Sequence, residues 1–487
     1  MPPNHAPLGG FPVLLLLALG LSLRLSLIWA YPIIFGIDSI TRLMHRHLIV
    51  IAHQLPALQA SIHYLSALST DPLQIRCWMA VLGAVAGVGF YLLASHLMPC
   101  ADALFAGLFF ATNPFLVAYS IVPYQEILML AGLAFAFHFF FAARWFLAAV
   151  FLGLACLTRY EAWIACPVLA SVYVIRREKR LAGAVKAALL FGWAPLVWIL
   201  YNRGIGPKGT FLADSSISPA RLVRDAYIAW IALQNTPIPV LCLAALGLWA
   251  IARTPELRNF RYATLAAFLG IFLVAIPFSP FGDPRDPERF VSAREAHLPI
   301  AALILLAGTG LARAGRLRWP LAAAGLALGI FGSVRFVAQA TAEPDLEVSY
   351  RVAQYLNHNL GPQERALLLA KPVPPERLEA FVERAFRQQG EVGRRGAQEI
   401  LEQIDTSPMD YQRTLVHSRL GRDRLLSRAR SREAPQWVVV WGDFQPSTEE
   451  EAQYYNLAAA TPPVATISSG PLTARICRLA FRTEPRP

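Results

Sequence analysis

The chain has 487 residues, of which 55% are hydrophobic and only 16% are charged, and its mean hydropathy is +0.43. These values lie outside the range of soluble domains and predict a polytopic membrane protein. The formal net charge of +12 does not indicate nucleic-acid binding, because Lys and Arg fall mostly in short loops between apolar segments and form no basic face with interleaved aromatic residues. Five of the six cysteines lie in or beside apolar segments, so no disulfide framework is predicted.

The apolar segments predict helices that cross a bilayer, which takes about 20 residues in helical form. The first segment follows no basic stretch and precedes no convincing cleavage site, so we expect a retained helix rather than a signal peptide. Arg24 lies inside it and is expected to snorkel to the interface or to pair within the bundle. In total we expect eleven spans, at 11–30, 77–97, 102–121, 125–143, 145–158, 161–175, 183–201, 237–251, 262–277, 297–311 and 320–340.

Short basic connections between these spans set the expected orientation, since Lys and Arg accumulate on the cytoplasmic side. The basic residues of these connections are Arg144, Arg176, Arg177, Lys179, Arg180, Arg253, Arg258, Arg261, Arg313, Arg316 and Arg318. Counting spans from them puts the N-terminus in the cytoplasm. The loops 31–76, 202–236 and 278–296 then lie on the far side of a bacterial-type plasma membrane, as does everything after about residue 341.

Two domains are predicted. A transmembrane helix bundle covers 1–340, and its outer loops contain half-apolar stretches that are expected to lie in the interface plane. From 341 to 487 the composition becomes charged, and helical patterns (DLEVSYRVAQYLNHNL, PPERLEAFVERAFRQQ, TSPMDYQRTLVHSRL) alternate with short strand-like runs (ALLLA, WVVVW, VATIS, ARICRLAF). This alternation predicts a small soluble α/β domain outside the cytoplasm.

Ionisable residues far apart in the sequence are expected to meet on the non-cytoplasmic face. Asp38 follows the first span, and Glu126 lies between the third and fourth. Ionisable groups embedded in a membrane are usually functional. The occurrence of several such residues on the same face of the membrane therefore indicates a functional site. The connection between the fifth and sixth spans and the loop before the tenth add Arg159, Tyr160, Glu161, Arg285, Asp286, Glu288, Arg289 and Arg294.

Each of these residues also has a simpler interpretation. Asp38 is a possible N-cap of a short helix, and Glu126 a charge at a helix N-terminus that the macrodipole favours. Arg159 and Glu161 form an ion pair in that interpretation, and the arginines before the tenth span contact lipid headgroups. The histidines near Asp38 (His45, His47, His53 and His63) have no recognisable metal-ligand spacing. We therefore expect no cofactor, with a divalent metal as the alternative.

Five local motifs resemble the GT-C superfamily of membrane glycosyltransferases, which includes the protein O-mannosyltransferases and the bacterial lipid A aminoarabinose transferases. The first span contains LRLSL, and the first outer loop opens with FGID. NPFLVAYSIVPYQE precedes the fourth span, GLACLTRYEAWI crosses the fifth and sixth, and RFVSAREAHLPIAALILLAG enters the tenth. The resemblance rests on the order of these motifs and on the shared topology, across residues 11 to about 340.

The resemblance implies a transferase that moves a sugar from a polyprenyl-phosphate carrier to an acceptor hydroxyl outside the cytoplasm, with inversion. Asp38 matches the family's catalytic acid of the first loop and is expected to be the general base. Ser39 follows it where many members carry a second acid, which favours a lone base over a metal site. The resemblance further implies that Glu126 is a second catalytic acid. Donor phosphate binding is implied for Arg159, Arg289 and Arg294. Substrate binding is implied for Tyr160, Glu161 and His45.

The expected partners are therefore a polyprenyl-phosphate sugar, a protein, lipid or glycan acceptor, and membrane lipids, with no nucleic acid. Three other functions stay open. A transporter or flippase of lipid-linked sugars is expected to show inverted repeats and paired broken helices, and neither is found. An O-antigen ligase or polymerase is expected to have its principal outer loop late in the bundle. A non-catalytic scaffold is expected to lose nothing on replacement of Asp38.

Overall fold

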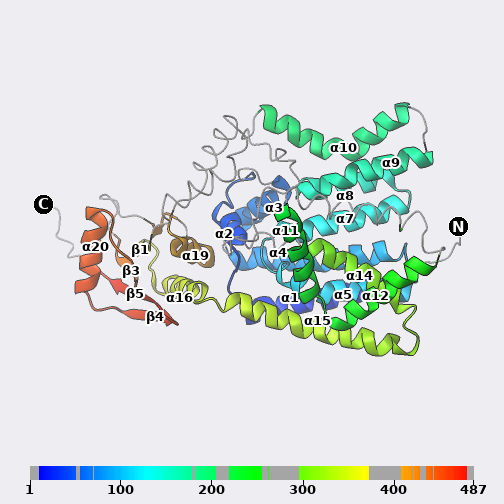
Figure 1. Cartoon of the computed structure of the whole chain (residues 1–487). Helices are drawn as coiled ribbons and strands as arrows, with labels where there is room; N and C mark the ends of the chain where they lie inside the picture. Colours follow the sequence, from blue (N-terminus) through cyan, green and yellow to red (C-terminus); the bar gives the residue numbers. More distant parts are fainter. Residues whose placement is uncertain are drawn as a thin grey trace.

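The computed structural model of the chain describes residues 10–50, 55–69, 71–177, 181–204, 219–254, 262, 296–371, 407–420, 422–427, 435–442 and 444–479. It is a helix bundle with a small sheet domain at one end (Figure 1). The long helices of the bundle are α1 (Gly10–Ala30), α4 (Pro72–Ala94), α5 (Cys100–Thr112), α7 (Gln125–Phe141), α8 (Trp145–Cys156), α9 (Ala165–Arg177), α10 (Leu181–Gly204), α11 (Pro219–Gln234), α12 (Ile238–Arg253), α14 (His297–Leu311) and α15 (Arg318–Thr341). Further helices lie in the connections between them, namely α2 (Ile37–Met44), α3 (Pro56–Leu68), α6 (Pro114–Ala118), η1 (Tyr160–Ile164) and η5 (Gly315–Leu317).

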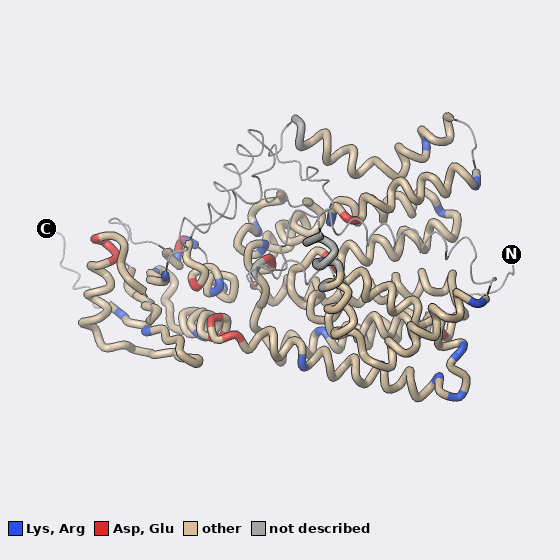
Figure 2. Tube along the Cα trace, viewed as in Figure 1, with Lys and Arg blue, Asp and Glu red and all other residues tan. Residues whose placement is uncertain are grey.

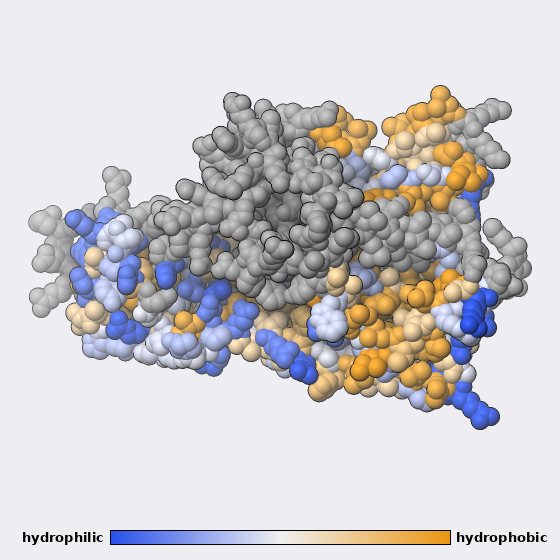
Figure 3. Space-filling model, in the orientation of Figure 1, coloured by the Kyte–Doolittle hydropathy of each residue, from blue (hydrophilic) through white to orange (hydrophobic). Residues whose placement is uncertain are grey.

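Apart from 102–121, the predicted spans coincide with helix over most of their described residues, and only 262–277 falls almost wholly outside the described residues. Among described helices, 4 are long and apolar enough to cross a membrane, or up to 5 if the bent pair Ile228–Gln234 and Ile238–Arg253 forms one span. Other apolar helices are shorter, so the number of eleven crossings stays a prediction. On the face that Figure 3 shows, the visible surface of the bundle is largely hydrophobic, whereas that of the C-terminal domain is largely hydrophilic.

Basic residues gather at the end of the bundle that lies far from the C-terminal domain (Figure 2). This end contains the turn between α7 and α8, the end of α9 and the turn between α14 and α15 (Figure 1). These are short basic connections that the sequence places on the cytoplasmic side. The C-terminal domain lies at the opposite end of the bundle, and its place outside the cytoplasm stays a prediction from these basic connections.

The span predicted at 102–121 is wrong as a single helix. α5 ends at Thr112, because Pro114 cannot continue its hydrogen bonds, and the Asn113 side chain caps α6 by accepting from the amides of Phe115 and Leu116, both at 3.1 Å. After α6 the chain turns through 119–124 before α7 begins. The break therefore places the N-terminus of α7 inside the protein, near the first outer loop.

Two buried arginines bind the backbone carbonyls that this break releases. Arg24, fully buried, donates from Nη1 to the carbonyl of Ala111 at 3.0 Å and from Nε to the Ser120 hydroxyl at 2.6 Å. Arg76 donates from Nε to the carbonyl of Ile121 at 3.0 Å. Arg24 therefore does not snorkel to the membrane interface. Its guanidinium instead pairs with polar groups of the broken segment, which would otherwise lack hydrogen-bond partners in an apolar bundle.

The C-terminal domain has a five-stranded sheet in the order β2-β1-β3-β5-β4. β1 is parallel to β2 and β3, whereas β3, β5 and β4 are antiparallel. The predicted strands appear as β1 (Ala366–Leu369), β3 (Trp437–Trp441), β4 (Ala465–Ser469) and β5 (Leu472–Arg478), and the structure adds β2 (Leu425–Leu426). The helices of this domain are α16 (Pro344–Asn359), α19 (Met409–His417) and α20 (Glu449–Ala460); the helix predicted at 374–389 lies outside the described residues.

Alternation along β1 and β3 divides the sheet into two apolar faces. Leu367, Val438 and Val440 face the side of α20, where they pack with Ala458. The alternate residues, such as Leu368 and others of β1 and β3, belong to the same continuous core as the bundle. α16 and α19 lie between this face and the bundle (Figure 1), so the C-terminal domain is packed onto the membrane domain rather than tethered to it.

Candidate active site

The first outer loop places Asp38 at the start of a short helix. α1 ends at Ala30, the chain is extended through 31–35, and Gly36 then turns it into α2 with a φ of 82°. Gly36 is the N-cap of α2, so Asp38 is a first-turn residue and not the cap. Its side chain is half-buried, and the helix N-terminus favours its negative charge.

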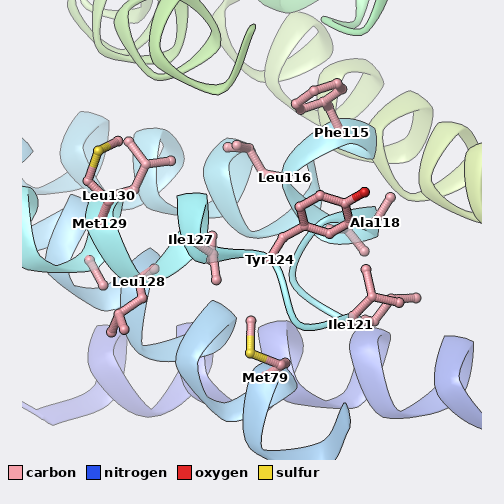
Figure 4. Close-up of a cluster of buried hydrophobic side chains, with 14 of the residues drawn as sticks. Met79, Phe115, Leu116, Ala118, Ile121, Tyr124, Ile127, Leu128, Met129 and Leu130 are labelled. Atoms are coloured by element: carbon pink, nitrogen blue, oxygen red, sulfur yellow. The ribbon is translucent and has the colours of Figure 1, made fainter. Parts of the chain in front are cut away.

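Gly36 is required at this turn for two reasons. A positive φ strains residues that carry a Cβ, and a Cβ at this position would overlap the Tyr124 hydroxyl. Tyr124 immediately precedes α7, so the turn before Asp38 lies against the N-terminus of α7. Figure 4 shows Tyr124 with Ile127 and Met79 in the apolar cluster of α4, α6 and α7 that supports this position.

Arg42 joins the helix of Asp38 to α7. It lies one turn after Asp38, is only 1% exposed, and donates from Nη2 to the side-chain oxygen of Gln125. Gln59, from α3, donates to the backbone carbonyls of Arg42 at 3.3 Å and His45 at 2.9 Å. α2 is therefore held from two sides by buried polar contacts, which fixes the helix that carries the acid.

Arg42 also lies within electrostatic reach of the next residue along α7. The pKa of Arg42 is lowered to about 10, mainly by burial; the negative charge of Glu126 opposes this shift, and the positive charge of Arg159 adds to it. These effects arise because the three side chains share one weakly solvated region. Arg42, Glu126 and Arg159, from the first, third and fifth interhelical segments, thus meet, and Asp38 lies one turn before Arg42 on α2.

Arg159 is bound between two carboxylates. Its Nη1 forms an ion pair with Glu126, its Nη2 with Glu161, and its Nε donates to both Glu161 oxygens at 3.1 and 2.9 Å. Arg159 and Glu126 are 6% and 2% exposed, respectively. The ion pair of Arg159 with Glu161 is confirmed, and Glu126 extends it across the gap between two helices. Buried charges of this kind require such compensation.

The other predicted site residues are arranged around this cluster or lie elsewhere. The Tyr160 hydroxyl accepts from the Trp198 indole at 3.1 Å, and its ring stacks edge-on against Trp163. His45 donates a hydrogen bond from Nδ1 to the carbonyl of Thr41 at 2.9 Å. Arg289 and Arg294 lie outside the described residues, as do Arg285, Asp286, Glu288 and His53.

Sequence reasoning missed the neutral residues that assemble the site. Gln125, Gln59 and Tyr124 carry no charge, and Arg42 was assigned no role. The spacing of Asp38 and Arg42 was the available signal, since residues i and i+4 lie on one face of a helix. Within the described ranges, no group of three or more His, Cys, Asp or Glu side chains is arranged to hold a metal ion.

Comparisons with known proteins identify the fold. No protein-family model and no curated protein matches the sequence. A crystal structure of ArnT from Cupriavidus metallidurans bound to undecaprenyl phosphate is similar, with a TM-score of 0.57 and 13% identity, over 96% of this chain and 98% of that chain. The apo structure of the same protein gives a TM-score of 0.53 and 14% identity, over 96% and 97%. The chain therefore has the fold of these ArnT structures, which agrees with the fold that the resemblance of its sequence motifs implied.

Proposed function

We propose that this protein is an integral membrane glycosyltransferase that transfers a sugar from a polyprenyl-phosphate donor to an acceptor hydroxyl on the extracytoplasmic side. The observation that carries the proposal is the contact of Arg42 with Gln125. It joins the helix of Asp38 to the cluster of Glu126, Arg159 and Glu161. The undecaprenyl phosphate bound by the similar ArnT structure supports a lipid-phosphate donor.

In this mechanism Asp38 acts as the general base. Its carboxylate takes the proton of the acceptor hydroxyl while the hydroxyl oxygen attacks the anomeric carbon. The bond between that carbon and the phosphate oxygen breaks, and the polyprenyl phosphate leaves with the electron pair. A single displacement of this kind inverts the anomeric carbon. Half-burial of Asp38 suits the role, because a carboxylate that is only partly solvated is a stronger base than one in bulk water.

The charge balance of the cluster distinguishes the roles of its arginines. Counted over the described residues of the cluster, the carboxylates of Glu126 and Glu161 are matched by the guanidinium groups of Arg159 and Arg42. A neutral, hydrogen-bonding region suits sugar or acceptor hydroxyl groups better than a dianionic phosphate. We therefore assign Glu126 and Glu161 to hydroxyl groups and Arg159 to holding both carboxylates. Arg289 and Arg294 are the candidates for the departing phosphate, whose growing charge they would stabilise.

The test compares Asp38→Asn with the intact protein in transfer of radiolabelled sugar from polyprenyl-phosphate sugars to membrane acceptors. The amide keeps the size of the side chain but cannot accept the proton, and general base catalysis contributes about 10²–10⁴-fold. We expect transfer to fall by that factor while donor binding persists. Equal transfer by both proteins would refute the role of Asp38 and favour the transporter or scaffold interpretation.

Asp71→Asn is the matched control. Asp71 is the other acid of the 31–76 loop, and it caps α4 by accepting from the amide of Leu73 at 2.9 Å. Asparagine caps helices as well as aspartate does, so this variant removes a carboxylate from the same loop without loss of the cap. We expect its transfer activity to match that of the intact protein.

A further inference from the structure

The C-terminal domain reaches the first outer loop through His417, the last residue of α19. The backbone amide of Ile34 donates to Nε2 of His417 at 2.7 Å, across 383 residues of sequence. Nδ1 of the same ring lies 2.7 Å from the carbonyl of Arg413. A carbonyl only accepts, so Nδ1 carries the proton and Nε2 is the acceptor. The neutral ring is thereby fixed in one tautomer, with both nitrogens engaged.

This contact lies four residues before Asp38 in the sequence. Ile34 is buried, and the extended segment 31–35 is not part of a sheet. The backbone amide of Ile34 therefore depends on a side chain for a hydrogen-bond partner. At the other end of α2, Arg422 donates from Nη2 to the carbonyl of Met44 at 3.1 Å. The chain from Ile34 to Met44 is therefore held at both ends by residues that surround the end of α19, which lies beside α2 (Figure 1).

We propose that His417 is a positioning residue, which holds the segment carrying Asp38 through the Ile34 amide and so makes the C-terminal domain part of the active site. The inference rests on the proposed function, because positioning matters only if Asp38 acts on a substrate. It gives the domain a definite role, namely setting where the base lies. Protonation of His417 releases the segment, since Nε2–H would then face another N–H donor.

The surroundings of His417 keep the ring neutral. Its pKa is lowered to about 4, mainly by burial; the hydrogen bond to the Arg413 carbonyl opposes this shift, and the charges of Arg76 on α4 and Arg413 on α19 add to it. Tyr350 of α16 packs edge-on against the ring at 5.5 Å between centroids. Arg413 is itself paired with Asp345 at 2.8 Å and with Asp410 at 3.3 Å. The contact with Ile34 is therefore intact at neutral pH and is lost in acid.

The test is hydrogen–deuterium exchange of peptides covering 31–44 in the full-length protein, in detergent at pH 7 and without substrate. His417→Leu removes the acceptor, whereas His417→Gln places a side-chain oxygen near the position of Nε2 and cannot be protonated. We expect exchange at Ile34 to rise at least tenfold in His417→Leu and to stay at the wild-type rate in His417→Gln. At pH 4, where about half of the His417 rings are protonated, exchange at Ile34 in the wild type should rise several-fold after correction for intrinsic rates, and His417→Gln should keep its protection.

Arg419→Gln is the control, since Arg419 is 71% exposed and its pair with Asp71 at 3.1 Å is screened by solvent. Unchanged exchange in His417→Leu, or equal loss of protection in both His417 variants, would overturn the proposal. If His417→Leu fails to fold, the comparison of wild type with His417→Gln across pH decides alone. Because no substrate is present, the result is independent of transfer activity. In a transfer assay, His417→Leu should lower kcat at unchanged donor KM.

Discussion

Replacement of Arg159 by methionine tests the buried ion cluster most directly. Methionine is similar in length and removes the guanidinium, which leaves Glu126 and Glu161 buried without their shared cation. Glu126 and Glu161 are 2% and 14% exposed, respectively. Removal of one partner from a buried ion pair costs about 3–5 kcal/mol, because the remaining charge is neither solvated nor paired. We expect the free energy of unfolding to fall by about that amount.

The assay is denaturant-induced unfolding in detergent micelles, followed by tryptophan fluorescence. Arg144→Met is the matched control, because Arg144 is exposed and precedes α8 just as Arg159 follows it. That variant should lose less than about 1 kcal/mol. The triple variant with Glu126→Gln and Glu161→Gln should recover most of the stability, since no uncompensated charge remains. A loss in Arg159→Met no larger than in Arg144→Met would show that the carboxylates do not depend on Arg159.

Three other structural features give further predictions. Gly36→Ala should lower the free energy of unfolding by about 1–3 kcal/mol, because alanine strains the backbone at this position. Adding Tyr124→Phe should recover only part of this loss. Full recovery would mean that backbone strain is negligible. Cys156 and Cys166, whose sulfurs lie 3.5 Å apart, should form an intramolecular disulfide with a membrane-permeant oxidant, detected by mass spectrometry of the linked peptides; failure to link would contradict their adjacency. The pKa of His417 near 4 lies below the ordinary value of about 6.5. The contribution of His417 to the free energy of unfolding should therefore be constant above pH 6.5 and fall by about 1.4 kcal/mol per pH unit between pH 6.5 and 4. His417→Gln should remove that part of the slope, and an identical pH profile would contradict the assignment.

Helix positions in the bundle were predictable because a helix in lipid must satisfy its own backbone, so apolar runs of sufficient length have few other options. The strands of the C-terminal domain were predictable from short β-branched and aromatic runs such as WVVVW. β2 was missed because it contains only Leu425 and Leu426, and α20 because its sequence is polar and buries only Ala458. The break after Thr112 was signalled by the Asn-Pro pair, but an apolar run on both sides concealed it.

The sequence by itself determined which residues carry charge in an apolar chain, and hence that Asp38, Glu126, Arg159 and Glu161 were candidates. Only the tertiary structure decided their partners. Arg42 meets Gln125 across 83 residues, Arg159 meets Glu126 across 33, and His417 meets Ile34 across 383. Local patterns report burial and backbone preference, because both depend on neighbouring residues. A hydrogen bond or an ion pair depends on which distant segments pack together, and that is settled only when the whole chain has folded.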